Sequence, residues 1–97
     1  LQQELLESFI DDASIYIEKA LAAYREGDAV TVSRIAHQIK GASSTVAVRF
    51  MPEIAAKLER QAKANELEGI EEICAELSAV LEQLKQYLEM GNLGNNG

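Results

Sequence analysis

The sequence has very few residues of the kinds that stabilise a fold through covalent cross-links or metal ions. Its 97 residues include one cysteine, one proline, one histidine and no tryptophan. The single cysteine, Cys74, excludes an intramolecular disulfide, and the Cys and His clusters of structural zinc sites are absent. We therefore expect a protein of a reducing compartment, the cytoplasm, that folds around an apolar core.

Long apolar runs and an excess of basic charge are also missing. No stretch approaches the ~20 apolar residues that cross a bilayer, and 9 Lys+Arg stand against 16 Asp+Glu, for a net charge of -7. Such a charge repels nucleic-acid phosphates and anionic lipids. We expect neither a nucleic-acid nor a membrane partner. The chain starts at Leu1 and not at Met, as a fragment of a longer protein would.

The residues that are present favour one helical domain. Apolar residues make up 47% of the chain, and they recur with the 3.6-residue period of a helix without alternating for the length of a strand. Turn-forming residues divide the chain into four stretches. The first covers roughly residues 3–25, and Asp28 or Thr31 caps the second. The third opens at 49–52 and closes at Asn65, and the fourth ends near Met90.

Four amphipathic helices joined by short turns predict an all-α fold, an antiparallel up-down-up-down four-helix bundle over residues 1–90. Residues 91–97 are rich in Gly and Asn, so we expect a flexible tail or linker there. No wide second apolar face is visible, which favours a monomer over the alternative of a bundle that dimerises through its first helix.

His37 is the only imidazole, and helix geometry predicts its surroundings. At about 100° per residue, Lys40, Gly41 and Ser44 lie within about 60° of His37, on one polar stripe. The apolar residues of this helix lie about 160–220° away. We therefore expect His37 on the side that faces away from the core.

Gly41 is the unexpected member of this stripe. A glycine inside a helix costs about 1 kcal/mol relative to alanine, and on the solvent side it gains no packing in return. The missing side chain leaves a shallow open surface beside the ring of His37, across which another protein could approach. Lys40 supplies a cation next to this surface.

The motif that runs from His37 to Gly41, His-Gln-Ile-Lys-Gly, is followed by the small residues Ala-Ser-Ser. It resembles the His-x-Leu/Ile-Lys-Gly signature of the histidine phosphotransfer (HPt) domain of two-component phosphorelays. The Gly27-Asp28 turn and the segment 57–59 also fall where that family would place them. The likeness covers about residues 4–90.

The resemblance implies a role for three side chains. His37 would accept a phosphoryl group from an aspartate of a receiver domain and pass it to another receiver, and Lys40 would assist electrostatically. Glu59 would accept a hydrogen bond from the other imidazole nitrogen and so fix which nitrogen is the nucleophile. The alternative for Glu59 is an ordinary surface carboxylate.

The resemblance also implies a docking face and a partner. Gly41 and Ser44 would keep the approach clear, and we add Arg34 and Gln38 to the candidate binding residues. Residues 34–63 carry a net charge of +4 and the remainder -11, an asymmetry that could steer the acidic pocket of a receiver. The simpler interpretation of this asymmetry is a basic, solvent-exposed face that balances the acidic helices and binds no partner. The partners would be response-regulator receivers, with a hybrid sensor kinase as a further candidate.

This chain would be a co-substrate without autonomous catalysis. No cofactor of its own is expected, because the Mg²⁺ and its acidic ligands would belong to the receiver. One position departs from the family: Ala47 stands where glycine is usual near the end of the second helix, and alanine does not readily take the left-handed conformation. We expect an altered turn there. This departure supports the alternative of a helical interaction module that binds receivers without carrying phosphate.

Overall fold

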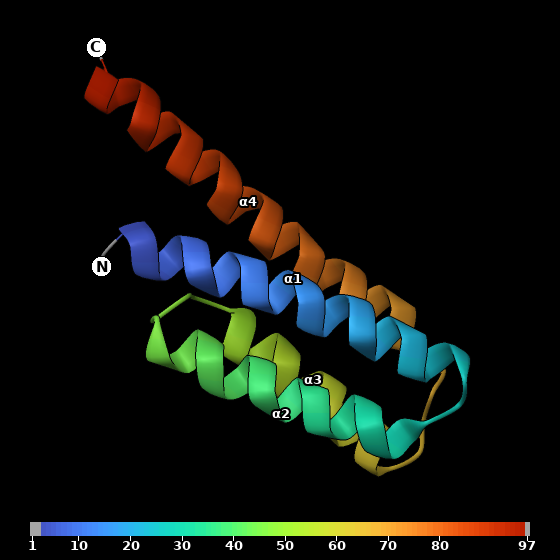
Figure 1. Ribbon diagram of the computed structural model, residues 1–97. Helices are drawn as coiled ribbons and strands as arrows, with labels where there is room; N and C mark the ends of the chain where they lie inside the picture. The colour runs from blue at the N-terminus through green and yellow to red at the C-terminus, as the bar shows by residue number, and fades with distance from the viewer. Residues whose placement is uncertain (1–2, 97) are drawn as a thin grey trace.

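Four α-helices make up the fold seen in the computed structural model, which describes residues 3–96 and the side chains of residues 3–91. Helix α1 covers Gln3–Arg25, α2 covers Ala29–Thr45, α3 covers Met51–Lys63 and α4 covers Ile70–Asn96 (Figure 1). None of the described residues lies in a strand. The first helix has the predicted bounds, and the all-α prediction is confirmed.

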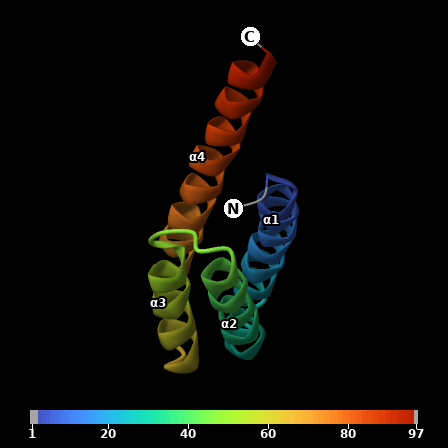
Figure 2. The same ribbon diagram turned by 90° about the vertical axis from the view of Figure 1, so that its left-hand side faces the viewer.

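The helices form a ring in which each packs against its neighbours in the chain. The contacts join α1 to α2, α2 to α3 and α3 to α4, and contacts between α1 and α4 close the ring. Successive helices run in opposite directions, as Figures 1 and 2 show. The arrangement is the predicted antiparallel up-down-up-down bundle.

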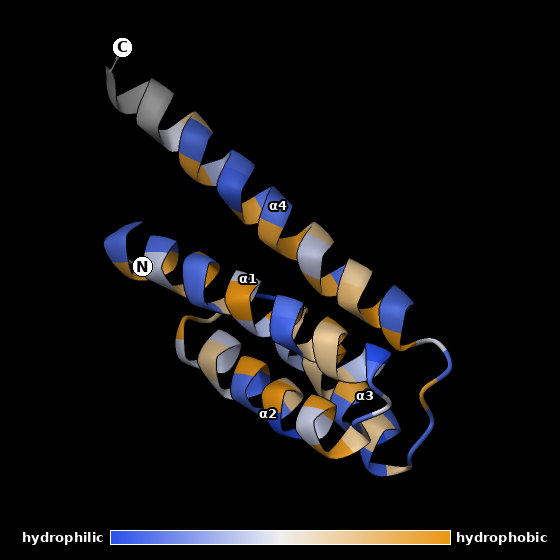
Figure 3. Cartoon of the chain, turned by 45° about the vertical axis from the view of Figure 1, so that its right-hand side comes forward, coloured by the Kyte–Doolittle hydropathy of each residue, from blue (hydrophilic) through white to orange (hydrophobic). Residues whose placement is uncertain are grey.

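The core lies on the inner faces of all four helices (Figure 3). Its largest fully buried side chains include Ile39, Met51, Leu58, Ile70 and Leu77. Each such side chain contributes about 1.5–3 kcal/mol of apolar burial. Because this burial is spread over the four helices, the bundle holds α2 and α3 side by side without any cross-link.

Cys74 belongs to this core and not to a reactive site. The residue is 1% exposed, and burial raises the pKa of its thiol to about 11. A thiol that stays protonated is a poor nucleophile. The interpretation of Cys74 as core filler is therefore confirmed.

Three of the helices end in the same hydrogen-bonded turn, the Schellman motif, which needs one residue in the left-handed conformation. Gly27 after α1 has φ +73°, Ala47 after α2 has φ +57° and Asn65 after α3 has φ +57°. At the end of α2, the N–H of Val48 donates to Ser43 O at 3.0 Å and that of Ala47 to Ser44 O at 3.2 Å. Our expectation that alanine would alter this turn was wrong: the motif forms with alanine in the strained position.

The predicted helix starts agree with the structure. Asp28 is the N-cap of α2, because its carboxylate accepts the backbone N–H of Thr31 at 3.1 Å. Thr31 is therefore the partner of the cap and not the cap itself. Pro52 lies in the first turn of α3, where its missing N–H leaves no hydrogen bond unmade.

The end of α4 differs from the prediction. The helix does not stop near Met90 but continues to Asn96, and it projects beyond the rest of the bundle in Figure 1. Gly and Asn are poor helix formers, but extending a helix that already exists needs no new nucleus and adds one hydrogen bond per residue. Residues 91–96 are thus helical in backbone; Gly97 lies outside the described residues, and a linker role stays a prediction.

No helix within the described residues combines the length and apolar content required to span a membrane.

The strained turn at Ala47 yields a stability prediction. A residue other than glycine in the left-handed conformation costs about 1–2 kcal/mol. Substitution by glycine removes this strain, but the larger entropy of glycine in the unfolded chain offsets part of the gain in stability. We expect Ala47→Gly to raise the free energy of unfolding by about 1 kcal/mol, measured by urea denaturation. Ala75→Gly, at an exposed position inside α4, is the matched control and should lower it by about 1 kcal/mol. A destabilised Ala47→Gly variant would contradict the assignment of strain to this turn.

Candidate functional site

The imidazole of His37 lies on the outer side of α2. Its side chain is 69% exposed, whereas Val32, Ile35 and Ile39 on the opposite side of the helix are buried, as is Val46 directly after its end. The helical period places these residues as predicted, so the orientation of His37 follows from the sequence of α2 alone.

The surface beside the ring is open. A Cβ added at Gly41 would meet no other heavy atom within 4 Å, so packing within the chain does not require glycine there. Ser44, Arg34 and Gln38 are exposed as well. The four candidate docking residues therefore share the accessible surface of α2 with His37, and their role in binding a partner stays a prediction.

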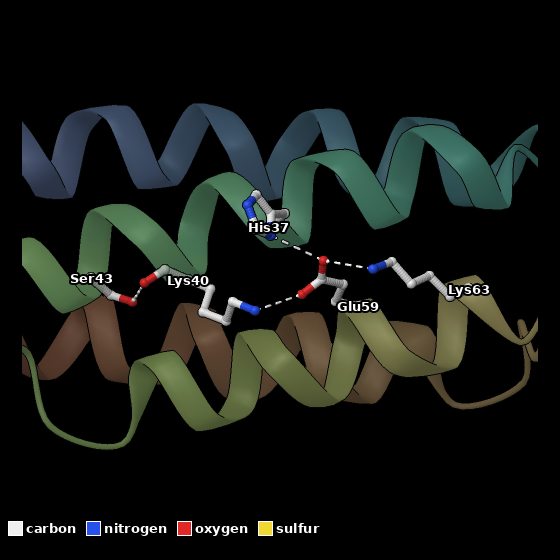
Figure 4. A network of polar contacts seen from close by, with 5 residues as sticks. All are labelled: His37, Lys40, Ser43, Glu59 and Lys63. Carbon is white, nitrogen blue, oxygen red and sulfur yellow. Dashed lines mark hydrogen bonds and ion pairs between the residues drawn. The ribbon is translucent and has the colours of Figure 1, made fainter.

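Glu59 of α3 faces His37 across the α2–α3 interface and connects three donors (Figure 4). Its Oε2 lies 3.1 Å from His37 Nδ1 and 3.3 Å from Lys63 Nζ. Its Oε1 accepts a hydrogen bond from Lys40 Nζ at 2.9 Å. The sequence prediction named His37, Lys40 and Glu59, and the structure brings these three side chains together.

The surroundings of Glu59 keep it ionised. Its side chain is only 9% exposed, so the alternative of an ordinary surface carboxylate was wrong. The hydrogen bond from Lys40 lowers its pKa, burial opposes that effect, and Lys63 lowers the pKa further, to a value of about 2. Near neutral pH the side chain is therefore a carboxylate that can only accept hydrogen bonds.

This carboxylate selects one tautomer of the neutral imidazole. Because Oε2 of Glu59 can only accept, Nδ1 of His37 at 3.1 Å carries the proton, and Nε2 keeps its lone pair. The nitrogen that does not face Glu59 is thus the nucleophilic one, on a side chain that is 69% exposed, and the buried carboxylate holds the ring through Nδ1.

Lys63 is the member of the site that the sequence reasoning missed. It lies one helical turn after Glu59, at the i,i+4 spacing at which oppositely charged side chains meet. That spacing was the available signal. Lys40 and Lys63 approach the carboxylate of Glu59 from opposite directions (Figure 4).

Small hydroxyl residues complete the local structure of α2. Ser43 is buried and its hydroxyl donates to the backbone oxygen of Lys40 at 3.1 Å. The hydroxyl of Thr45 donates to the backbone oxygen of Gly41 at 3.0 Å. These bonds satisfy the hydroxyls within the helix and leave the space above Gly41 open.

No group of three or more His, Cys, Asp or Glu side chains among residues 3–91 is arranged to hold a metal ion.

The low pKa of Glu59 makes stability depend on pH. Its folded-state pKa of about 2 lies below the ordinary value of 4.5. The resulting stabilisation is therefore complete above the ordinary value and is lost as the pH falls through the folded-state value. We expect Glu59→Gln to lower the free energy of unfolding at pH 7 by about 1–3 kcal/mol and to flatten its decline between pH 4.5 and 2.

Urea denaturation at a series of pH values measures this difference. The control is Glu53→Gln, which replaces an exposed carboxylate of the same helix. It shows how much of the change in the free energy of unfolding comes from removing any negative charge from α3. Parallel acid curves for the wild type and Glu59→Gln would contradict the assigned ion-pair network.

Comparison with known proteins identifies the family of the chain. A family model, described as the Hpt domain, matches residues 4–87. Comparisons with curated proteins and with solved structures give no match. The matched range includes the whole site and most of all four helices. The chain belongs to the Hpt family, the histidine phosphotransfer domains of phosphorelays.

Proposed function

We propose that the chain is a phosphorelay intermediate in which His37 accepts a phosphoryl group from a receiver-domain aspartate and passes it to a second receiver. The observation that carries this proposal is the contact of 3.1 Å between His37 Nδ1 and the carboxylate of Glu59. This contact leaves the lone pair on Nε2, in an imidazole whose side chain is 69% exposed. A nucleophile that must react with a group on another protein needs both properties.

The transfer step follows from this tautomer. The lone pair of Nε2 attacks the phosphorus of the aspartyl phosphate, so an N–P bond forms. The bond between phosphorus and the aspartate oxygen breaks, and its electron pair leaves on the aspartate. The ring keeps the proton on Nδ1 and becomes cationic, and the carboxylate of Glu59 compensates this charge. The same step in reverse delivers the group to the second receiver.

Charge neutralisation and alignment supply most of the catalysis of phosphoryl transfer. Lys40, one helical turn after His37 and with a side chain 37% exposed, would place a cation near the moving oxygens. The Mg²⁺ and its acidic ligands would come from the receiver. The chain would therefore act as a co-substrate and would not turn over alone.

The docking face would be the exposed side of α2. The small residues Gly41 and Ser44 would leave the surface beside the ring unobstructed for a partner, and Arg34 and Gln38 lie next to the ring on the same exposed side. The net charge of +4 over residues 34–63, against -11 elsewhere, would orient this face toward an acidic receiver pocket. We propose a cytoplasmic monomer that exchanges phosphate with response-regulator receivers, free or within a hybrid sensor kinase.

Transfer from a panel of receivers tests the function. The receivers carry ³²P-labelled aspartyl phosphate and Mg²⁺, and each is mixed with the wild-type protein or with His37→Gln. We expect an acid-labile, alkali-stable label on the wild type and none on the variant, because only the imidazole can form the N–P bond. Circular dichroism checks that the variant keeps its helices, as substitution of an exposed side chain should allow.

An equal label on both proteins would contradict the role of His37. Binding to receivers in titration calorimetry without any label would favour the alternative, an interaction module that does not carry phosphate.

A further inference from the structure

The carboxylate of Glu59 contacts two lysine ammonium groups, whereas the transfer step described above uses only one lysine. Lys40 contacts Oε1 at 2.9 Å, and Lys63 contacts Oε2 at 3.3 Å. Both ammonium groups are tied to one buried carboxylate, although Lys40 is the cation expected to stabilise a phosphoryl group. The second cation calls for an explanation.

The position of the phosphoryl group creates a conflict for Lys40. Nδ1 of His37 faces Glu59 at 3.1 Å, and Nε2 lies on the other side of the ring, so a group on Nε2 points away from the carboxylate. To contact a phosphoryl oxygen there, Lys40 would have to give up its hydrogen bond to Oε1. A buried carboxylate that loses its counter-ion is strongly destabilised.

We propose that Lys63 is a positioning residue that acts as the standing counter-ion of Glu59 and thereby frees Lys40 to move to the phosphoryl group on His37. This inference rests on the proposed function. Lys63 suits the role because it binds Oε2 and leaves Oε1 to Lys40. It also comes from the same helix as Glu59, at a spacing of four residues, so its contact does not depend on the state of α2.

The charges of His37, Lys40, Glu59 and Lys63 are compatible with the movement of Lys40 from Glu59 to the phosphoryl group. With a neutral imidazole, two lysines and one carboxylate give a net charge of +1 on the residues of the network. Once Lys40 leaves, Glu59 still has Lys63 and the Nδ1–H of a ring that has become cationic. Its charge therefore stays compensated in both states. Without Lys63, Lys40 would be the only ammonium group on Glu59 and would be retained there.

Chemical phosphorylation by phosphoramidate tests the proposal without a receiver. The P–N bond of the reagent breaks, ammonia leaves, and Nε2 of His37 takes the phosphoryl group. We expect Lys63→Met to lower the second-order rate constant about fivefold, the size of a partly exposed ion-pair effect. Lys63→Arg should restore it to within about twofold. Lys57→Met removes the same charge from the same helix, about 160° away from Glu59 on the helix surface, and should change the rate less than about twofold.

A double-substitution cycle separates the exchange from a simple charge effect. If Lys63 acts through Lys40, then Lys40→Met and Lys40→Met/Lys63→Met have the same rate constant within about twofold. If the two lysines act independently, the effects multiply, which would overturn the proposal. Equal rates for Lys63→Met and Lys57→Met would overturn it as well, while leaving the proposed function intact. A wild type that takes up no phosphoryl group from phosphoramidate or from any receiver overturns both.

The ammonium ¹H–¹⁵N signals of the two lysines give a direct reading. On phosphorylation of the wild type, the signal of Lys40 should shift and that of Lys63 should remain in place. In Lys63→Met the signal of Lys40 should stay near its unphosphorylated position. A shift of Lys63 in the wild type, with Lys40 unchanged, would reverse the assignment and overturn the proposal.

Discussion

The structure of the site depends on one buried carboxylate, that of Glu59, held between α2 and α3. Burial of a charge is costly unless donors surround it, and here an imidazole and two ammonium groups do so within 3.3 Å. Two of these donors come from α2, so the interaction ties the two helices together where His37 lies. The same contact decides which nitrogen of the imidazole carries the proton. One interaction therefore links the stability of the bundle to its chemistry.

The orientation of His37 could be predicted because it depends only on the period of one helix. The apolar residues of α2 fix its inner side, and His37, Lys40 and Gly41 then fall on the opposite side whatever α2 packs against. The burial of Glu59 could not be derived in this way. It depends on how α2 and α3 face each other, and only the resemblance to the family pointed to its contact with His37. Lys63 was missed because its only signal in the sequence is the i,i+4 spacing from Glu59, which does not involve the histidine.

The helix ends show where local rules and tertiary structure disagree. Gly27 and Asn65 adopt the left-handed conformation that their residue types favour, and Ala47 adopts the same conformation against its preference. The turn at Ala47 leads into Val48 and Met51, both buried in the core, and their burial offsets the local strain. At the end of α4 the opposite occurs: poor helix formers continue a long helix to Asn96, because no residue there forbids the next backbone hydrogen bond.

The central claim is that Glu59 holds the proton on Nδ1 and so directs phosphoryl transfer to Nε2. The protein has one histidine, so ¹⁵N labelling of histidine gives only two ring nitrogens, and coupling to ³¹P in the phosphorylated protein identifies the one that is bonded to phosphorus. The account predicts coupling at Nε2 and a proton on Nδ1. Phosphorus on Nδ1, the nitrogen that faces the carboxylate, would contradict it.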